Sequence, residues 1–204
     1  KGHHPIAVPE FIGFFAADEV PRGGSADLSA FRPPAHEAFL QFSSGTTGAK
    51  KGVKISARAL FNQIDAYAPC VAHAPGDRVV SWLPHYHDMG LIACMLMPFV
   101  LGVPIHMMSP FEWVMHPRLL LEWLARVGGT HVWLPNFALG HLARSCAEDD
   151  PAEFDLSSVR QLVCCSEPVL KGTVDAFVER FSASGINPDR LQNCYAMAEN
   201  TFAM

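Results

Sequence analysis

The sequence predicts an α/β fold in which a mostly parallel sheet is flanked by helices. Short apolar runs alternate along the chain with longer segments in which apolar residues recur every three to four positions. The first pattern is typical of buried parallel strands and the second of amphipathic helices. Of the 204 residues, 50% are hydrophobic and 17% are charged, which allows one sizeable core.

The expected elements follow in order along the chain. Residues 1–37, rich in Pro and Gly, are expected to form an irregular lead-in, and residues 38–204 the folded domain. Strands are expected over 38–42, 53–55, 78–83, 103–107, 131–134 and 159–164, with a further short apolar stretch from Leu191. Helices are expected over 60–67, 90–100, 119–127, 137–147 and 169–181. Pro98, Gly102 and Pro104 interrupt the apolar stretch 89–108, which therefore predicts a helix and a strand rather than a membrane span.

Charge and cysteine content narrow the class of protein. The net charge is −5, and no Lys/Arg cluster exceeds the one in residues 50–54, which argues against a nucleic-acid partner. The six cysteines show no Cys-x-x-Cys spacing and several lie in apolar runs, so we expect buried thiols in a reducing cytoplasm. The adjacent Cys164 and Cys165 are expected to be packing residues rather than nucleophiles.

A loop rich in glycine and hydroxyl side chains lies between the first two expected strands. Glycines let successive N–H groups point into one concavity, hydroxyls add donors, and lysine supplies positive charge, so this composition predicts phosphate binding. The P-loop of NTPases does not fit, because no Ser or Thr follows Lys51 and a strand, not a helix, comes next. The candidate phosphate-binding residues are Ser43, Ser44, Gly45, Thr46, Thr47, Gly48 and Lys51.

This loop resembles the signature of the adenylate-forming superfamily: acyl-CoA synthetases, amino-acid-adenylating domains and fatty acyl-AMP ligases. Further motifs follow in the family's order: Tyr-His-Asp-Met-Gly-Leu at 86–91, Pro-Asn-Phe-Ala at 135–138, Ser-Glu-Pro at 166–168 and Cys-Tyr-Ala-Met-Ala-Glu at 194–199. The first two are most similar to the fatty acyl-AMP ligase branch. The resemblance implies part of the large N-terminal domain, with the C-terminal domain and its catalytic lysine absent.

The resemblance also implies roles for individual residues. Lys51, His87 and Glu199 would be catalytic, with Glu199 the ligand of Mg²⁺ and Lys51 holding the β and γ phosphates of ATP. The adenine would be bordered by Ser166, Glu167, Pro168, Tyr195 and Ala196, and the acid by His87, Trp133, Asn136 and Phe137. Ala196 stands where the family has glycine, so its Cβ would crowd an approaching base or force strain in the backbone.

The positions of these motifs predict one site. In parallel α/β sheets, ligands bind beyond the carboxyl ends of the strands. The phosphate loop follows the strand that ends near Phe42, and the other loops follow the strands 78–83, 159–164 and the stretch from Leu191. We therefore expect four loops on one rim of the sheet.

Three local alternatives stay open. His85 and His87 could be two ligands of a metal ion, and Glu199 could be a solvated surface carboxylate. The bulky Trp133 and Leu134 stand where the family branch has small residues, so the acid could be short or aromatic. Alternatively, Trp133 belongs to the packing of the sheet.

The expected function is ATP-dependent activation of a fatty or other carboxylic acid to acyl-AMP, with transfer to the phosphopantetheine thiol of an acyl carrier protein. This places the parent among the acid–thiol ligases of lipid metabolism or of polyketide or nonribosomal peptide biosynthesis. One alternative is an acyl-CoA synthetase that uses CoA. Another is a catalytically silent nucleotide-binding module of an assembly line. The 204-residue chain by itself is expected to be inactive.

Overall fold

The computed structural model describes residues 37–43 and 51–204. The chain divides into two units, Lys1–Pro33 and Pro34–Met204, and all described residues belong to the second. The expected lead-in lies outside the described residues except for Glu37, as does the part of the phosphate loop from Ser44 to Lys50.

A five-stranded sheet forms the centre of the second unit. Its strands lie in the order β4 (Ile105–Met107), β3 (Val79–Ser81), β5 (His131–Leu134), β6 (Gln161–Cys164) and β7 (Leu191–Asn193). Every neighbouring pair is parallel. All residues of β3, β5 and β6 are buried, which explains why these strands consist mostly of apolar residues. The expected parallel sheet is confirmed.

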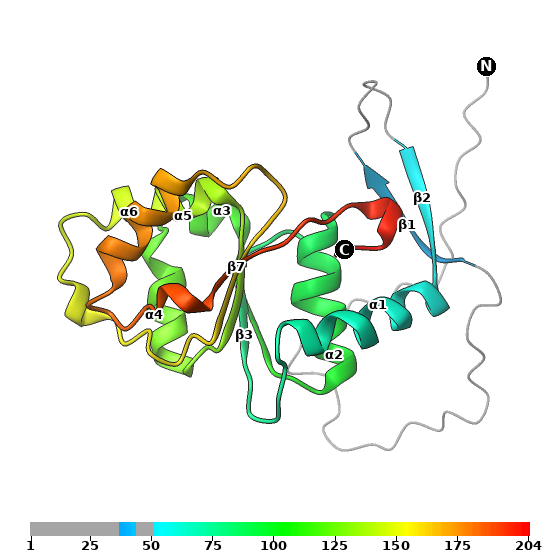
Figure 1. The fold of residues 1–204 in the computed structure, drawn as a ribbon, viewed down its shortest axis with the longest axis horizontal. Coiled ribbons are helices and arrows are strands. Elements are labelled where there is room, and N and C mark those ends of the chain that lie inside the picture. Colours follow the sequence, from blue (N-terminus) through cyan, green and yellow to red (C-terminus); the bar gives the residue numbers. More distant parts are fainter. Residues whose placement is uncertain (1–36, 44–50) are drawn as a thin grey trace. The chain divides into compact units, whose positions relative to one another are not determined.

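Helices cover both faces of this sheet (Figure 1). Helices α4, α5 and α6 lie on one face, and α1 and α2 lie on the other. The helices are α1 (Ala57–Cys70), α2 (Met97–Leu101), α3 (Pro110–Met115), α4 (Arg118–Val127), α5 (Asn136–Ser145) and α6 (Lys171–Phe181). A π-helical segment, η1 (Met89–Leu96), precedes α2, and single 3₁₀ turns form η2 (Pro151–Glu153), η3 (Pro188–Arg190) and η4 (Ala198–Asn200). None of the described helices is both long and apolar enough to cross a membrane.

The strand order explains why the helices divide between two faces. From β3 the chain moves to β4 at one edge, then crosses back over β3 to β5 and continues through β6 to β7. Right-handed crossovers in opposite directions place their helices on opposite faces. The reversal makes the space between the carboxyl ends of β3 and β5 the topological switch point, where open α/β sheets bind ligands.

The first two strands do not belong to this sheet. Strands β1 (Glu37–Ser43) and β2 (Lys51–Ser56) form a separate antiparallel hairpin, with Leu40 opposite Lys54 and Phe42 opposite Gly52. The expectation that the phosphate loop follows a strand of the parallel sheet was therefore wrong. A nearly continuous apolar run such as residues 38–42 does not by itself show which sheet a strand joins, and a short connection favours antiparallel pairing of consecutive strands.

The segment after β3 differs in detail from the single helix expected over 90–100. Asp88 caps it by accepting a hydrogen bond from the Met89 N–H to Oδ1 at 2.7 Å. The turn is π-helical up to Leu96, and α2 then begins at Met97 with Pro98 in its first turn. Proline lacks the N–H that an uninterrupted α-helix would need there, which is one reason for the change of helix type.

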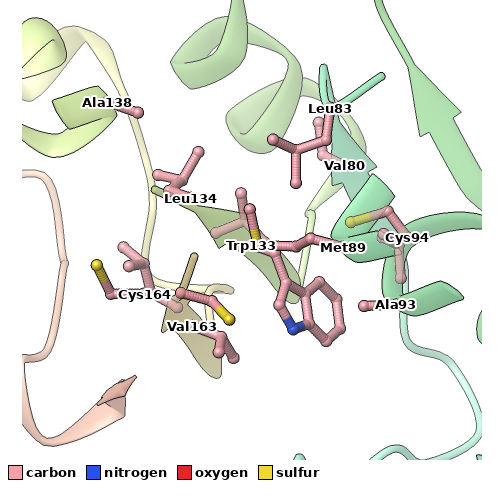
Figure 2. Packing of buried hydrophobic residues seen from close by; sticks show 14 of the residues in the cluster. Val80, Leu83, Met89, Ala93, Cys94, Trp133, Leu134, Ala138, Val163 and Cys164 are labelled. Atoms are coloured by element: carbon pink, nitrogen blue, oxygen red, sulfur yellow. The ribbon is translucent and has the colours of Figure 1, made fainter. Parts of the chain in front are cut away.

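The core extends across both faces of the sheet. Trp82 and Trp113 stack on one another with ring centroids 3.9 Å apart. Figure 2 shows the indole of Trp133 pointing toward the segment that carries Met89, Ala93 and Cys94. The expectation of buried thiols is confirmed for Cys94, Cys146, Cys164 and Cys165, and all six cysteines are free.

Candidate nucleotide and acyl site

Loops from three strand ends border one large cavity. The cavity has a volume of about 930 Å³, within the range of small-molecule sites. It is lined by residues 85–88 after β3, by Ser166 after β6 and by residues 196–199 after β7, together with residues 40–42 of the hairpin and Leu91. The cavity therefore lies at the carboxyl ends of the parallel strands, where the topology places ligands.

The loop after β3 presents His87 to this cavity. Its side chain is half exposed, and its Nδ1 lies 2.8 Å from Oδ1 of Asp88, which is buried. The hydrogen bond to Asp88 holds the pKa of His87 above its ordinary value, against the effect of burial. The main chain of the same loop is tied to the hairpin, because the Gln41 side-chain amide donates to the Tyr86 carbonyl at 3.3 Å.

The loop after β6 has an unusual backbone. Ser166 adopts a positive φ of 75°, a conformation uncommon for a residue with a Cβ. This turn directs Ser166 to the cavity, while Glu167 points to another loop and accepts a hydrogen bond from the Phe137 N–H. The Leu170 N–H donates to Asn136 Oδ1 at 3.0 Å. Two hydrogen bonds thus join the 166–170 segment to the start of α5.

The loop after β7 brings Ala196 and Glu199 to the cavity. The backbone folds back on itself, with Ala196 paired to Ala203 and the Met204 N–H donating to the Tyr195 carbonyl at 3.0 Å. Glu199 is exposed, lies on η4 and lines the cavity. Tyr195 is 65% exposed and is not among the lining residues.

Lys51 is the first residue of β2 and is exposed, opposite Ser43 in the hairpin. It follows, after Ala49 and Lys50, the phosphate-loop residues Ser44, Gly45, Thr46, Thr47 and Gly48, which are outside the described residues.

Of the four residues assigned to the acid, His87 lines the cavity, and the other three are placed differently. Trp133 is wholly buried, and its indole N–H donates to the Tyr67 hydroxyl at 3.1 Å. Phe137 is half exposed and meets Trp82 edge to face. Asn136 is buried and accepts the hydrogen bond from Leu170 described above. None of the three lines the 930 Å³ cavity, and neither do Glu167 and Pro168.

The sequence left open a metal site at His85 and His87, and the structure places a group with metal-ligand spacing at other residues. Among the residues that the structure describes, the group of three side chains with metal-ligand spacing consists of His73, Asp77 and His131, not of the two loop histidines. Asp77 and His131 lie near the amino ends of β3 and β5, at the opposite edge of the sheet from the cavity.

Several lining residues received no role from the sequence, and the polar ones and Met197 are of most interest: Gln41, Tyr86, Asp88 and Met197. Gln41 carried a detectable signal, since it is the single polar residue in the apolar run 38–42. Its buried amide needs a partner, and it finds the Tyr86 carbonyl. Tyr86 and Asp88 stood within a recognised motif but had been given no role.

A parallel sheet with a cavity at the carboxyl ends of its strands is the architecture of ligand-binding α/β proteins. Residues 12–204 match the family model of the AMP-binding enzymes, so the chain belongs to that family. Its fold is that of part of the N-terminal domain of adenylate-forming enzymes. The family match begins within the segment expected as a lead-in.

Three similar proteins illustrate the relationship. The medium-chain-fatty-acid–[acyl-carrier-protein] ligase JamA of Moorena producens is 34% identical over 164 residues, covering 80% of this chain and 28% of JamA. The long-chain-fatty-acid–AMP ligase FadD23 of Mycobacterium tuberculosis is 36% identical over 170 residues, covering 80% of this chain and 29% of FadD23. The crystal structure of the fatty acyl-adenylate ligase from Legionella pneumophila, in complex with acyl adenylate and pyrophosphate, has a TM-score of 0.78 at 32% identity. That structure matches over 84% of this chain and 31% of its own, so the chain spans less than a third of these proteins.

Proposed function

We propose that the protein to which these residues belong activates a carboxylic acid with ATP, forming an acyl adenylate and pyrophosphate. It then transfers the acyl group to the phosphopantetheine thiol of a carrier protein. Residues 38–204 would form part of its AMP-binding domain. The observation that carries the proposal is the convergence of His87, Ser166, Ala196 and Glu199, from three separate strand ends, on one cavity.

The chemistry explains why these residue types are needed. Attack of a carboxylate on the α-phosphate of ATP joins two anions, so positive charge must be held in place before the reaction. His87, whose pKa Asp88 raises, would supply such charge on the acid side. Lys51 and the loop that includes Ser43 to Gly48 would supply it for the β and γ phosphates.

Glu199 is the proposed ligand of Mg²⁺. The ion prefers carboxylate and phosphate oxygens and keeps several waters, which an exposed carboxylate at the cavity wall allows. The Asp88 carboxylate also lines the cavity, but it is buried, which leaves little room for the waters that Mg²⁺ keeps. Tyr195 and the segment from Ser166 to Pro168 would border the adenine. Asn136 and Phe137 would border the acid, with Trp133 behind them.

The test is ATP–pyrophosphate exchange with a panel of carboxylic acids, using the chain extended to the length of its relatives. His87→Ala should lower the exchange rate by about 10²–10³-fold, the effect of removing one preorganised electrostatic group. Glu199→Gln should raise the Mg²⁺ concentration needed for activity. The matched control is Glu179→Gln, which changes an exposed carboxylate on α6 and should leave the rate unchanged.

Two results would count against the proposal. If no acid supports exchange in the folded, extended protein, a silent nucleotide-binding module explains the fold better. An unchanged Mg²⁺ requirement in Glu199→Gln would make Glu199 a surface carboxylate. The 204-residue chain by itself is expected to support no exchange.

The acceptor is the second part of the proposal. JamA is described as an acyl-carrier-protein ligase, which supports a carrier-protein thiol here. The alternative is CoA, with the same first half-reaction. Supplying the purified adenylate-forming protein with either a phosphopantetheinylated carrier protein or CoA, and measuring thioester formation, distinguishes the two.

A further inference from the structure

Two cysteines face each other where β6 and β7 end. Cys164 pairs with Asn193 in the parallel register, and the Cys194 N–H donates to the Cys164 carbonyl at 2.8 Å, which continues the ladder by one residue. Cys165 therefore lies opposite Cys194. Neighbouring strands are about 4.8 Å apart, within the range of Cα separations that a disulfide spans.

Both side chains lie on the face of the sheet that α1 covers. Trp133, Val163 and Gln192 are register partners across β5, β6 and β7, and side chains two residues apart on a strand share a face. Cys165 and Cys194 follow Val163 and Gln192 by two residues, so they lie on the face of Trp133. That face meets Tyr67 of α1, whose hydroxyl accepts the Trp133 N–H.

The environment of Cys194 favours the thiolate, which is the reactive form of a cysteine side chain. A hydrogen bond from the Cys165 thiol lowers the pKa of Cys194 below its ordinary value; burial opposes this and the Tyr67 hydroxyl assists it. Burial instead raises the pKa of Cys94 to about 12 and that of Cys146 to about 11. Cys194 is half buried and lines a second cavity, of about 280 Å³, through which a small oxidant can approach.

We propose that Cys194 and Cys165 form an oxidative modification site that closes a disulfide in response to hydrogen peroxide. The Cys194 thiolate attacks one peroxide oxygen, the O–O bond breaks, and Cys194 becomes a sulfenic acid as hydroxide leaves. The Cys165 sulfur then attacks the Cys194 sulfur, and the hydroxyl group leaves as water with the Cys165 proton. The hydroxide takes up the proton that Cys194 released on becoming a thiolate, so two thiols lose two electrons in all and one peroxide is reduced to two waters.

The position of the pair connects it to the proposed nucleotide site. Cys165 directly precedes Ser166, and Cys194 directly precedes Tyr195 and Ala196, so a bond between them fixes the two segments proposed to border the adenine. This consequence rests on the proposed function. The formation of the disulfide does not.

The experiment treats the chain with hydrogen peroxide under denaturant-free conditions, counts titratable thiols and maps the cross-linked peptides by mass spectrometry. We expect the six thiols to fall to four, with the loss of two hydrogen atoms in a Cys165–Cys194 peptide pair that dithiothreitol restores. Cys194→Ser should abolish the reaction. In Cys165→Ser, a sulfenic acid on Cys194 should accumulate and be trapped by a 1,3-diketone reagent. The matched control is Cys70→Ser, which removes an exposed thiol of the same cavity and should still cross-link.

Several results would overturn the inference: six thiols after peroxide, a cross-link between other cysteines, or cross-linking that survives in Cys194→Ser. ATP affinity is then compared between the reduced and the cross-linked chain, and we expect it to fall on cross-linking. Equal affinities would refute the connection to the adenine segments. A reduced chain that does not bind ATP would count against the proposed function, while the peptide map still decides the disulfide.

Discussion

At the scale of single residues, the Asp88 carboxylate makes two contacts that have different effects. Asp88 Oδ1 caps the π-helical segment through the Met89 N–H and lies 2.8 Å from His87 Nδ1. The first contact fixes the position of the loop after β3. The second favours the positive form of the imidazole that lines the cavity.

Replacing Asp88 with asparagine should separate these two tasks. The amide oxygen of the new side chain can still cap Met89, because asparagine is as good a cap as aspartate. The charge is lost, so the pKa of His87 should fall. Since a raised pKa keeps His87 protonated at higher pH, Asp88→Asn should move the loss of its positive charge to lower pH. NMR titration of the ring protons measures this, with Asp189→Asn on η3 as the control that leaves His87 unchanged. An unshifted titration in Asp88→Asn would contradict the assignment.

A substitution of Trp133 tests whether this side chain limits the chain length of the acid in the proposed reaction. It fills space between β5 and η1 without lining the large cavity (Figure 2). Trp133→Gly should open that space to longer acids, with up to about 0.8 kcal/mol for each methylene accommodated. Loss of the buried side chain should also cost about 3–5 kcal/mol of stability. Chain-length profiles of exchange activity are compared with Trp123→Gly, a partly buried residue of α4. Identical profiles in Trp133→Gly and the wild type would make Trp133 a packing residue only.

At the scale of elements, periodicity predicted the long helices and the buried strands but not the details set by tertiary contacts. Helices α1, α4, α5 and α6 and strands β3 to β6 lie close to their expected ranges, because each buries a face or a run that the sequence displays. Helix α3 was missed, since its six residues are too few to show a period. The hairpin and the π-helical segment depend on pairing and close approach, which no local pattern contains.

The candidate site could be predicted only in part for the same reason. His87, Ser166, Ala196 and Glu199 were assigned by the resemblance of their motifs to the family. That their loops meet at one edge of the sheet could be predicted because each loop follows a strand that the sequence displays. That Asn136 and Glu167 instead tie two loops together could not be predicted. Their partners, Leu170 and Phe137, are backbone N–H groups that come close only in the folded chain.

Gly90 provides a test of how closely the start of the π-helical segment packs against the loop after β3. A Cβ built on Gly90 would lie 2.3 Å from the Pro84 carbonyl oxygen, a backbone atom that cannot move away without shifting the loop after β3. Gly90→Ala should therefore destabilise the protein by more than the roughly 1–3 kcal/mol typical of overpacking. Gly172→Ala on α6 is the matched control, because nothing lies within 4 Å of its Cβ. It should be neutral or add about 0.5–1 kcal/mol. Equal unfolding midpoints of the two variants in urea would contradict this account.

At the scale of the whole molecule, a buried polar cluster sits at the edge of the sheet opposite the cavity. His73 and His131 stack with ring centroids 4.1 Å apart, and both lie near Asp77, which also pairs with Arg160. The His131 ring is held by the Val71 carbonyl at 2.8 Å, whereas both ring nitrogens of His73 are buried without a hydrogen-bond partner among the described residues. Burial lowers the pKa of His73 to about 4.

This cluster predicts sensitivity to acid. Between pH 6.5 and about 4, the unfolded chain protonates His73 and the folded protein does not, so stability is present above pH 6.5 and is lost as the pH falls. The free energy of unfolding should fall by at most about 3 kcal/mol over this range. His73→Phe keeps a ring against His131 and removes the titrating group, so its unfolding free energy should fall less over this range. Urea unfolding at several pH values measures the slope, and His116→Gln, an exposed histidine, is the control. A slope unchanged in His73→Phe would refute the prediction.

The reversal of the strand order also has a consequence for synthesis. Strand β3 receives its second neighbour, β5, only after β4 and the helices that follow it have been made. At about 5–20 residues per second, the roughly 50 residues between Ser81 and His131 take the ribosome several seconds. During that time an apolar strand has one open edge, the kind of surface on which chains pair with one another. Nascent or truncated chains that end between β4 and β5 should therefore aggregate, and chains that extend beyond β7, in which every inner strand has both neighbours, should stay in the supernatant.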